Sequence, residues 1–181
     1  MKYGFVLPNM EPFRALEMAR EAEAHGWDGF FVWEPVWGID PWVLLGALSV
    51  ATKRIKLGTM LTPPSRRRPW KLAGETATLD ILSQGRAILS LGLGAVDTGF
   101  EAFGEATDRK TRAELLDESI DILTGPTRVG AFLQGSREGD PGTIGRVSRV
   151  EVVATGGDRR EIVLTSAGRR HAGCREGQQV R

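Results

Sequence analysis

The chain has 181 residues, a formal net charge of +1 at pH 7 and a single cysteine, Cys174. This length fits one domain with an appendage, and the near-neutral charge gives no reason to expect a nucleic acid or a membrane surface as a partner. One cysteine excludes an internal disulfide, and the apolar runs are too short for a signal peptide or a membrane span, so we expect a cytoplasmic protein.

Four strand–helix units are predicted in the first 125 residues. Each unit has a short apolar run, as in a buried parallel strand, followed by a segment with apolar residues at helical spacing. The spacing of Thr111 and Glu114 is that of a capping box and predicts the start of the fourth helix. The predicted strands cover 3–7, 29–33, 55–61 and 87–91, and the predicted helices cover 12–25, 41–54, 69–83 and 111–125.

The alternation of strands and helices predicts an α/β fold with parallel strands and right-handed crossovers. Four units are half of the eight in a complete (β/α)8 barrel, which needs about 250 residues. We therefore predict a partial TIM-type barrel with about four βα units. An open doubly wound sheet has the same alternation, and periodicity alone does not separate the two folds.

The composition changes abruptly at Gly125-Pro126. All five lysines and all five tryptophans precede this point, whereas residues 126–181 contain ten arginines, ten glycines and one aromatic residue, Phe132. We place a domain boundary here, with half of a barrel over 1–125 and a tail over 126–181. The composition of the tail suggests translation out of frame in a GC-rich gene. Reading the nucleotide sequence in the other two frames after codon 125 tests this hypothesis.

The tail contains one pattern of secondary structure. A valine-rich run at 146–154 and the apolar run Ile162-Val163-Leu164 flank Thr155-Gly156-Gly157-Asp158, which predicts a β-hairpin over residues 146–165. Chance spacing of apolar residues is the alternative. Residues 166–181 are predicted to be disordered.

Several strings of residues occur together in a set order. They are 57–64, 67–69, 73–80, 82–86, 91–94, 100–104 and 114–125. In this order they resemble the luciferase-like monooxygenase family over about residues 2–125. The resemblance implies a TIM-like barrel that binds FMN or coenzyme F420 at the C-terminal mouth of its strands. It also implies hydride transfer or O₂ activation at the flavin, a small-molecule substrate, and in many relatives a reductase that supplies reduced flavin.

The resemblance also implies which residues meet the cofactor. Glycine at positions 92 and 94 lets the backbone approach a ring or a ribityl chain, although a turn with positive φ requires glycine as well. Relatives often have a non-proline cis peptide after the third strand, which we expect near Thr59-Met60, whereas a plain buried strand with Met60 as core filler is the alternative. The cofactor-binding candidates are Asn9, Trp33, Thr59, Met60, Thr62, Gly92 and Gly94.

Glu34 is the candidate catalytic residue. Many relatives have an acidic residue followed by histidine at this strand end, and here Pro35 replaces the histidine. Flanked by Phe31, Trp33 and Trp37, the carboxylate would be partly desolvated. Desolvation raises the pKa of a carboxyl group and suits acid–base work or a hydrogen bond to a flavin. A role in capping or pairing at the strand end is the alternative.

Three consecutive arginines, Arg66 to Arg68, precede the third predicted helix. Such a run could attract a cofactor phosphate or the anionic tail of F420 at a helix N-terminus. We favour a solvated loop. No metal site is predicted, because neither His25 nor His171 has a partner at metal-ligand spacing.

Four strands alone leave two open sheet edges and an uncovered face. On this view the chain binds cofactor weakly unless a homodimer completes the barrel. Two other interpretations remain: an inactive half barrel, truncated or frame-shifted, and a small α/β binding module with a genuine C-terminal hairpin. Binding of FMN or F420, measured with the mass in solution, separates them.

Overall fold

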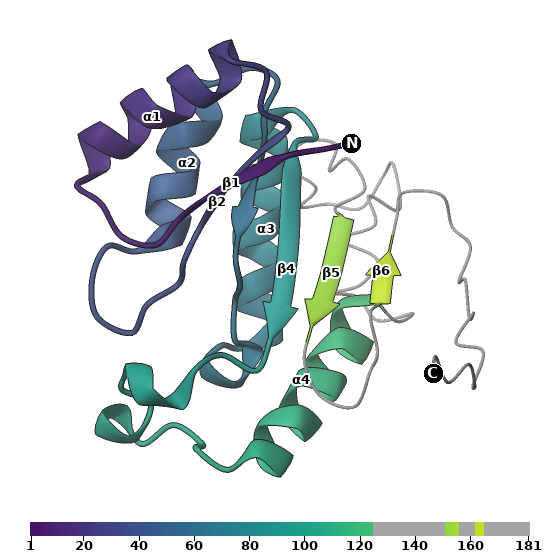
Figure 1. The fold of residues 1–181 in the computed structure, drawn as a ribbon. Coiled ribbons are helices and arrows are strands. Elements are labelled where there is room, and N and C mark those ends of the chain that lie inside the picture. The colour runs from purple at the N-terminus through teal and green to yellow at the C-terminus, as the bar shows by residue number, and fades with distance from the viewer. Residues whose placement is uncertain (125–150, 156–161, 165–181) are drawn as a thin grey trace, which may run out of the picture.

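The structure is a computed structural model that describes residues 1–124, 151–155 and 162–164. These residues form one six-stranded sheet in the order β1-β2-β3-β4-β5-β6 (Figure 1). Strands β1 to β5 run parallel to one another, and β6 is antiparallel to β5. The strands are β1 (Gly4–Leu7), β2 (Gly29–Val32), β3 (Lys56–Thr59), β4 (Ala87–Gly92), β5 (Glu151–Thr155) and β6 (Ile162–Leu164).

Each of the first four strands is followed by an α-helix. The helices are α1 (Pro12–Ala24), α2 (Pro41–Ala51), α3 (Pro69–Ser83) and α4 (Arg109–Thr124). Three 3-10 turns lie in the connections, η1 (Pro64–Arg66), η2 (Val96–Thr98) and η3 (Glu101–Phe103). This order confirms the predicted α/β fold with four βα units and parallel strands.

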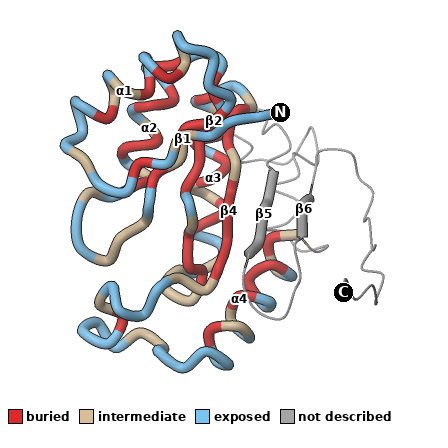
Figure 2. The backbone as a smooth tube through the Cα atoms, viewed as in Figure 1, coloured by how far each residue is buried: buried red, intermediate tan, exposed pale blue. Residues whose placement is uncertain are grey.

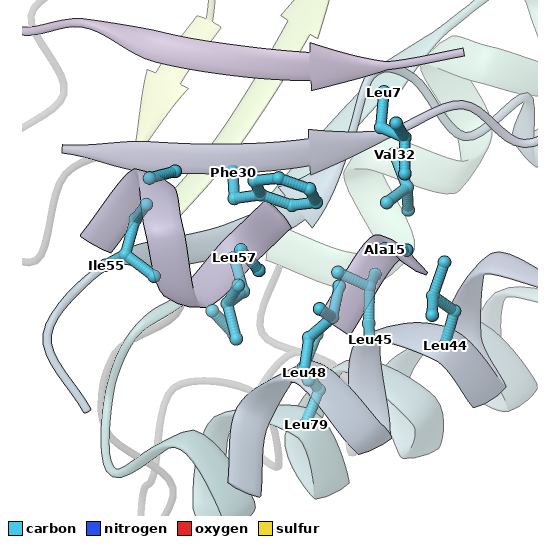
Figure 3. Close-up of a cluster of buried hydrophobic side chains, with 13 residues drawn as sticks. Leu7, Ala15, Phe30, Val32, Leu44, Leu45, Leu48, Ile55, Leu57 and Leu79 are labelled. Carbon is cyan, nitrogen blue, oxygen red and sulfur yellow. The ribbon is translucent and has the colours of Figure 1, made fainter. Parts of the chain in front are cut away.

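The hydrophobic core lies between the sheet and the helices, because alternate strand residues point toward the helices. Figure 3 shows one cluster, in which Phe30 and Leu57 meet Leu45 and Leu48 of α2, all four with no exposed surface. A second cluster joins α3, β4 and α4 through residues such as Leu89. In Figure 2 most of β2, β3 and β4 and the inner faces of the helices are buried, whereas β1 and most of the long connections are exposed.

The start of α4 differs from the prediction. Asp108 caps this helix, since its carboxylate accepts hydrogen bonds from the backbone N–H groups of Lys110 and Thr111, both at 2.9 Å. The helix therefore begins at Arg109, and the predicted capping box at Thr111 is wrong. A carboxylate cap on the first free N–H groups takes precedence over the spacing of Thr111 and Glu114.

Strand β5 pairs in parallel with most of β4, from Ile88 opposite Glu151 to Gly92 opposite Thr155. Strand β6 then pairs with β5, and this antiparallel pair lies within residues 146–165, where the sequence predicts a hairpin. The edge of β4 is therefore covered. The predictions for residues 126–145 and 166–181 lie outside the described residues.

Arg86 joins the N-terminal ends of the strands to the helices. Its side chain is buried and donates hydrogen bonds to the carbonyl oxygens of Ser49 (2.6 Å), Thr52 (3.1 Å), Ile55 (2.9 Å) and Ser83 (2.6 Å). One guanidinium group thus satisfies the carbonyls at the ends of two helices and the loop before β3.

We expect Arg86→Met to lower the free energy of unfolding of the full chain by about 4 kcal/mol, because several buried carbonyl groups lose their donor. Urea unfolding measures this loss. The control is Arg14→Met, because the side chain of Arg14 is 57% exposed. A loss for Arg86→Met no larger than that for Arg14→Met would contradict the assigned role.

Glu23 caps the loop before β3. Its carboxylate accepts hydrogen bonds from the backbone N–H groups of residues 53–55, with the shortest at 2.6 Å from Arg54. Burial acts to raise the pKa of Glu23, but these hydrogen bonds and the charge of Arg54 together bring it below the usual value for a glutamate. The ionised form therefore stabilises the fold above the unfolded-state pKa of about 4.3, and this stabilisation is lost as the pH falls through the folded-state pKa.

Glu23→Gln should lower the free energy of unfolding by about 1 kcal/mol at pH 7, as the loss of a carboxylate cap does. The difference from the unmodified chain should shrink below about pH 4.3, where Glu23 begins to protonate in the unfolded chain. Denaturant unfolding at a series of pH values measures both quantities. A difference that stays constant down to pH 3 would show that the ionised carboxylate is not what stabilises this loop.

Candidate functional site

The loops that follow β1 to β4 lie together at the C-terminal ends of these parallel strands, which form one edge of the sheet. The last residues of the first three strands are in register, with Leu7 opposite Val32 and Val32 opposite Thr59. A further bridge pairs Thr62 with Leu91. We call the four loops at this edge, residues 8–11, 33–40, 60–68 and 93–108, the rim. The predicted site residues thus follow strand ends that share an edge, which is the catalytic face of TIM barrels.

Aromatic and sulfur-containing side chains are exposed on the rim. Trp33 is 52% and Met60 is 42% exposed, and they follow the neighbouring strands β2 and β3. Trp37 and Phe103 are also exposed and contact each other, with ring centroids 4.7 Å apart. This contact joins the loop after β2 to the loop after β4. Other exposed apolar side chains, such as Phe13 and Trp70, lie outside the rim. Apolar groups exposed on neighbouring loops at the ends of parallel strands are nevertheless typical of a surface that binds a ligand or a partner.

Thr59 and Thr62 are buried and face each other. Their hydroxyl groups form a hydrogen bond of 2.8 Å, and the Thr59 hydroxyl also lies 3.5 Å from the carbonyl oxygen of Ser90. The peptide bond between Met60 and Leu61 is cis, one bond beyond the expected Thr59-Met60 position. The two hydroxyl groups therefore hold the end of β3 against β4, and Met60 is the residue of this segment that reaches the surface.

Gly94 has a clear packing role. Its φ is +70°, and a Cβ atom at this position would lie 2.7 Å from Pro63 Cγ and 3.0 Å from Phe100 Cζ. The space above its Cα is thus filled by protein side chains, and only glycine fits. Gly92 is buried within β4, where its N–H donates to the Thr62 carbonyl at 3.2 Å.

Asn9 lies at the same edge, in the exposed loop after β1. Asn9 and Trp33 line a cavity of only about 20 Å³, which is too small for a ligand, so their contacts with one would be made from the open surface. Three of the seven predicted cofactor-binding residues therefore have side chains at the surface of the rim: Asn9, Trp33 and Met60. The remaining cofactor candidates are buried or backbone positions.

Glu34 is the centre of a buried group of charges. Its side chain is 6% exposed and accepts a hydrogen bond of 2.7 Å from Arg67 Nε, while Arg66 Nη2 lies 3.7 Å from the same carboxylate oxygen. Arg66 also donates to the Glu34 backbone carbonyl at 2.9 Å, and Trp42 Nε1 donates to the carboxylate at 3.4 Å. The neighbours of the carboxylate are thus two guanidinium groups and Trp42, whereas the sequence led us to expect Phe31, Trp33 and Trp37.

The expectation of a solvated arginine loop is wrong for Arg66 and Arg67. Both side chains are largely buried, at 11% and 17% exposed, and Arg67 also binds Glu75 of α3 at 2.7 Å. The reason is that Glu34 and Glu75 supply carboxylates on two sides of the loop, and buried guanidinium groups need such partners. Arg68 is exposed, as expected.

Phe100 extends this group to the loop after β4. Its ring is 1% exposed and lies between two guanidinium groups, that of Arg66 at 5.1 Å and that of Arg112 at 5.8 Å from the ring centroid. Arg112 also donates hydrogen bonds to the carbonyls of Leu93 (2.7 Å) and Gly94 (3.1 Å). The loops after β2, β3 and β4 are therefore joined through side chains.

A cavity of about 420 Å³ lies beside this group of charges. Its walls come from the loop after β2 (residues 34–41), from Arg66 and Arg67, and from Phe103 and Glu105. Its size is in the range of small-molecule sites. In the part of the chain that the structure describes, no three His, Cys, Asp or Glu side chains are grouped to hold a metal ion.

Three residues that shape the site were not predicted from the sequence, Glu75, Phe100 and Arg112, and Arg67 was expected to lie in a solvated loop. One signal was available, because Arg112 shares the helical stripe of Leu116 and Ile120, and a charged residue in an apolar stripe needs a buried partner. The pairing of Glu34 with Arg67, 33 residues apart, leaves no local signal.

The sequence pattern of the luciferase-like monooxygenase family matches residues 3–137, and so extends past the boundary that the composition predicts at Gly125-Pro126. An uncharacterized protein of Mycobacterium tuberculosis is 36% identical over 162 residues, covering 76% of this chain and 52% of that protein. The F420-dependent glucose-6-phosphate dehydrogenase of Segniliparus rotundus is 34% identical over 122 residues, covering 62% of this chain and 36% of the enzyme. The chain thus spans about half or less of the length of these relatives.

Solved structures share the fold. The coenzyme F420-dependent tetrahydromethanopterin reductase of Methanopyrus kandleri superposes with a TM-score of 0.66 at 24% identity, over 84% of this chain and 49% of that one. A type II Baeyer–Villiger monooxygenase of Pseudomonas putida in complex with FMN gives a TM-score of 0.61 at 22% identity, over 77% of this chain and 42% of that one. No described helix is long and apolar enough to cross a membrane.

We expect Glu34→Gln to lower the free energy of unfolding by about 3 kcal/mol, because it removes the carboxylate beside the buried Arg66 guanidinium and leaves Arg67 with Glu75 as its remaining ion pair. Chemical denaturation measures the loss. Glu17→Gln, in an exposed ion pair with Arg14, is the control and should change stability by no more than about 0.5 kcal/mol. Equal stability of the two variants would contradict the account of the charge group.

Proposed function

Because the chain belongs to the luciferase-like monooxygenase family, we propose that it is an oxidoreductase domain that holds FMN or coenzyme F420 on its rim. The observation that carries this proposal is the exposure of Trp33 and Met60 at the shared C-terminal edge of parallel strands. Relatives by sequence and by fold include F420-dependent enzymes and an FMN complex, which supports both cofactors without separating them.

The residues at the rim fit a planar, conjugated ring. Trp33 offers an aromatic face and Met60 a polarizable thioether, and both groups bind aromatic surfaces well. The buried threonine pair behind Met60 fixes the backbone that presents it. Asn9, in the exposed loop after β1, could donate a hydrogen bond to a ring oxygen or accept one from a ring N–H. A bound flavin or deazaflavin would supply hydride transfer, and a flavin could also activate O₂.

We assign Glu34 a positioning role in this site. Its carboxylate is engaged by Arg67 and Trp42 and lies close to Arg66, so it is committed to holding the loop after β3 in place. General acid–base work would require the carboxylate to reach a substrate proton at hydrogen-bond distance. The cavity of about 420 Å³ that Glu34 lines is the proposed place for a small-molecule substrate.

Titration of the full chain with FMN and with F420, followed by cofactor fluorescence, tests the proposal. We expect saturable binding of one of the two, and a loss of about tenfold in affinity in Trp33→Ala, equal to the ~1.4 kcal/mol of one aromatic contact. Trp27→Ala is the matched control, because Trp27 precedes β2 and lies at the opposite edge of the sheet.

The mass in solution, measured on the same samples, tests the expected homodimer. A cofactor-bound dimer would support two copies that share a site, and a reductase would then be sought for an FMN-binding form. A folded chain that binds neither cofactor would overturn the proposal and favour an inactive half barrel. Equal losses of affinity in Trp27→Ala and Trp33→Ala would overturn the placement of the cofactor on the rim.

A further inference from the structure

We propose that the groove between η1 and α4 binds the oxyanion of a small molecule, at a site separate from the surface that carries Trp33 and Met60. The groove is a cavity of about 470 Å³. Residues 64–69 form one wall, and Glu105 with residues 115–122 of α4 forms the other. Its lining contains neither Glu34 nor any of the seven cofactor-binding candidates, but it includes the arginine run 66–68 and shares Arg66, Arg67 and Glu105 with the cavity proposed for the substrate.

Two buried polar atoms on the first wall are unmatched. Within the described part of the chain, neither Ser65 Oγ nor Arg66 Nε has a hydrogen-bond partner. An unmatched buried group costs about 1–3 kcal/mol, so such groups usually mark a bound ion, ligand or water. Both groups can donate to an oxyanion and both belong to residues that line the groove; because neither atom is exposed in this structure, binding requires the two side chains to turn toward the groove.

The same wall carries uncompensated positive charge. Arg68 is exposed, and the 15-residue helix α3 begins at Pro69 without a side-chain cap on its N-terminal N–H groups. Such a helix end attracts anions. Arg67 is already paired with Glu34 and Glu75, whereas Arg66 lies 3.7 Å from the Glu34 carboxylate and interacts electrostatically with Glu105 of the opposite wall. Burial lowers the pKa of Arg66, and a bound oxyanion would offset that cost.

The opposite wall selects what is attached to the oxyanion. Glu105, Glu118 and Ser119 offer acceptor oxygens across the groove. These carboxylates disfavour a polyanion and favour hydroxyl groups, which can donate to them. The site therefore suits a small hydroxylated phosphate monoester or carboxylate, bound by donors at one end and acceptors at the other.

Isothermal titration of the full chain at constant ionic strength, with inorganic phosphate and with glycerol 3-phosphate, tests this site. We expect saturable binding with a dissociation constant of about 1 mM or below, and tighter binding of glycerol 3-phosphate through its hydroxyl groups. Ser65→Ala and Arg68→Gln should each weaken binding about fivefold, equal to the ~1 kcal/mol of one hydrogen bond. Arg14→Gln removes an equal charge from an exposed arginine of α1 and should leave the affinity unchanged.

Two results would overturn the proposal. An absence of saturable binding would show that the groove holds only water, and equal weakening in Arg14→Gln would show that phosphate responds to the overall positive charge of the protein and not to the groove. Saturating phosphate should also leave the FMN or F420 titration unchanged. Displacement of the cofactor by phosphate would overturn the separateness of the two sites. Phosphate binding by a chain that binds neither cofactor would leave this site standing and remove only the proposed oxidoreductase function.

Discussion

The carboxylate of Glu34 joins two loops that come from different strands, and the shape of the rim depends on that contact. Arg67 and Arg66 approach it from the loop after β3, and Arg67 also pairs with Glu75, near the middle of α3. Burying this many charges is expensive, and the cost is offset only when each guanidinium meets a carboxylate, a carbonyl or an aromatic face. The loops therefore have one arrangement in which all these groups are paired.

Phe100 links this buried group of charges to the loop after β4. Its ring lies 5.1 Å from the Arg66 and 5.8 Å from the Arg112 guanidinium group and closes the space over Gly94, and Arg112 donates to two carbonyls of that loop. The rim is thus organised by contacts within residues 1–124. This matters for function because a cofactor surface is useful only when its side chains are held in place before the ligand arrives.

Much of the fold could be predicted because its signals are local. Helix α3 has the predicted bounds, Pro69 to Ser83, since a proline at its start and a glycine after its end are strong boundary signals. The shared edge of the strands followed from the alternation alone. The parallel pairing of β5 with β4 could not be predicted, because nothing in the composition of the tail indicates which edge a strand will join.

The candidate site was predicted less well, for a physical reason. Positions at strand ends can be read from the sequence, which located Trp33 and Met60 on the rim surface. Partners of buried charges cannot be read in this way, because Arg67 and Glu34 lie 33 residues apart and meet only after the sheet has formed. A run of three arginines looks solvated until the carboxylates around it are known.

The central claim is that the loops after β1 to β4 form one surface that holds a flavin or deazaflavin ring. Hydrogen–deuterium exchange of the full chain, with and without FMN or F420, tests it most directly, because it reports on both edges of the sheet at once. The account predicts slower exchange in the loops at residues 8–11, 33–38 and 60–64 when cofactor is added. Slower exchange confined to residues 25–28, 53–55 and 84–86, at the opposite edge, would contradict it.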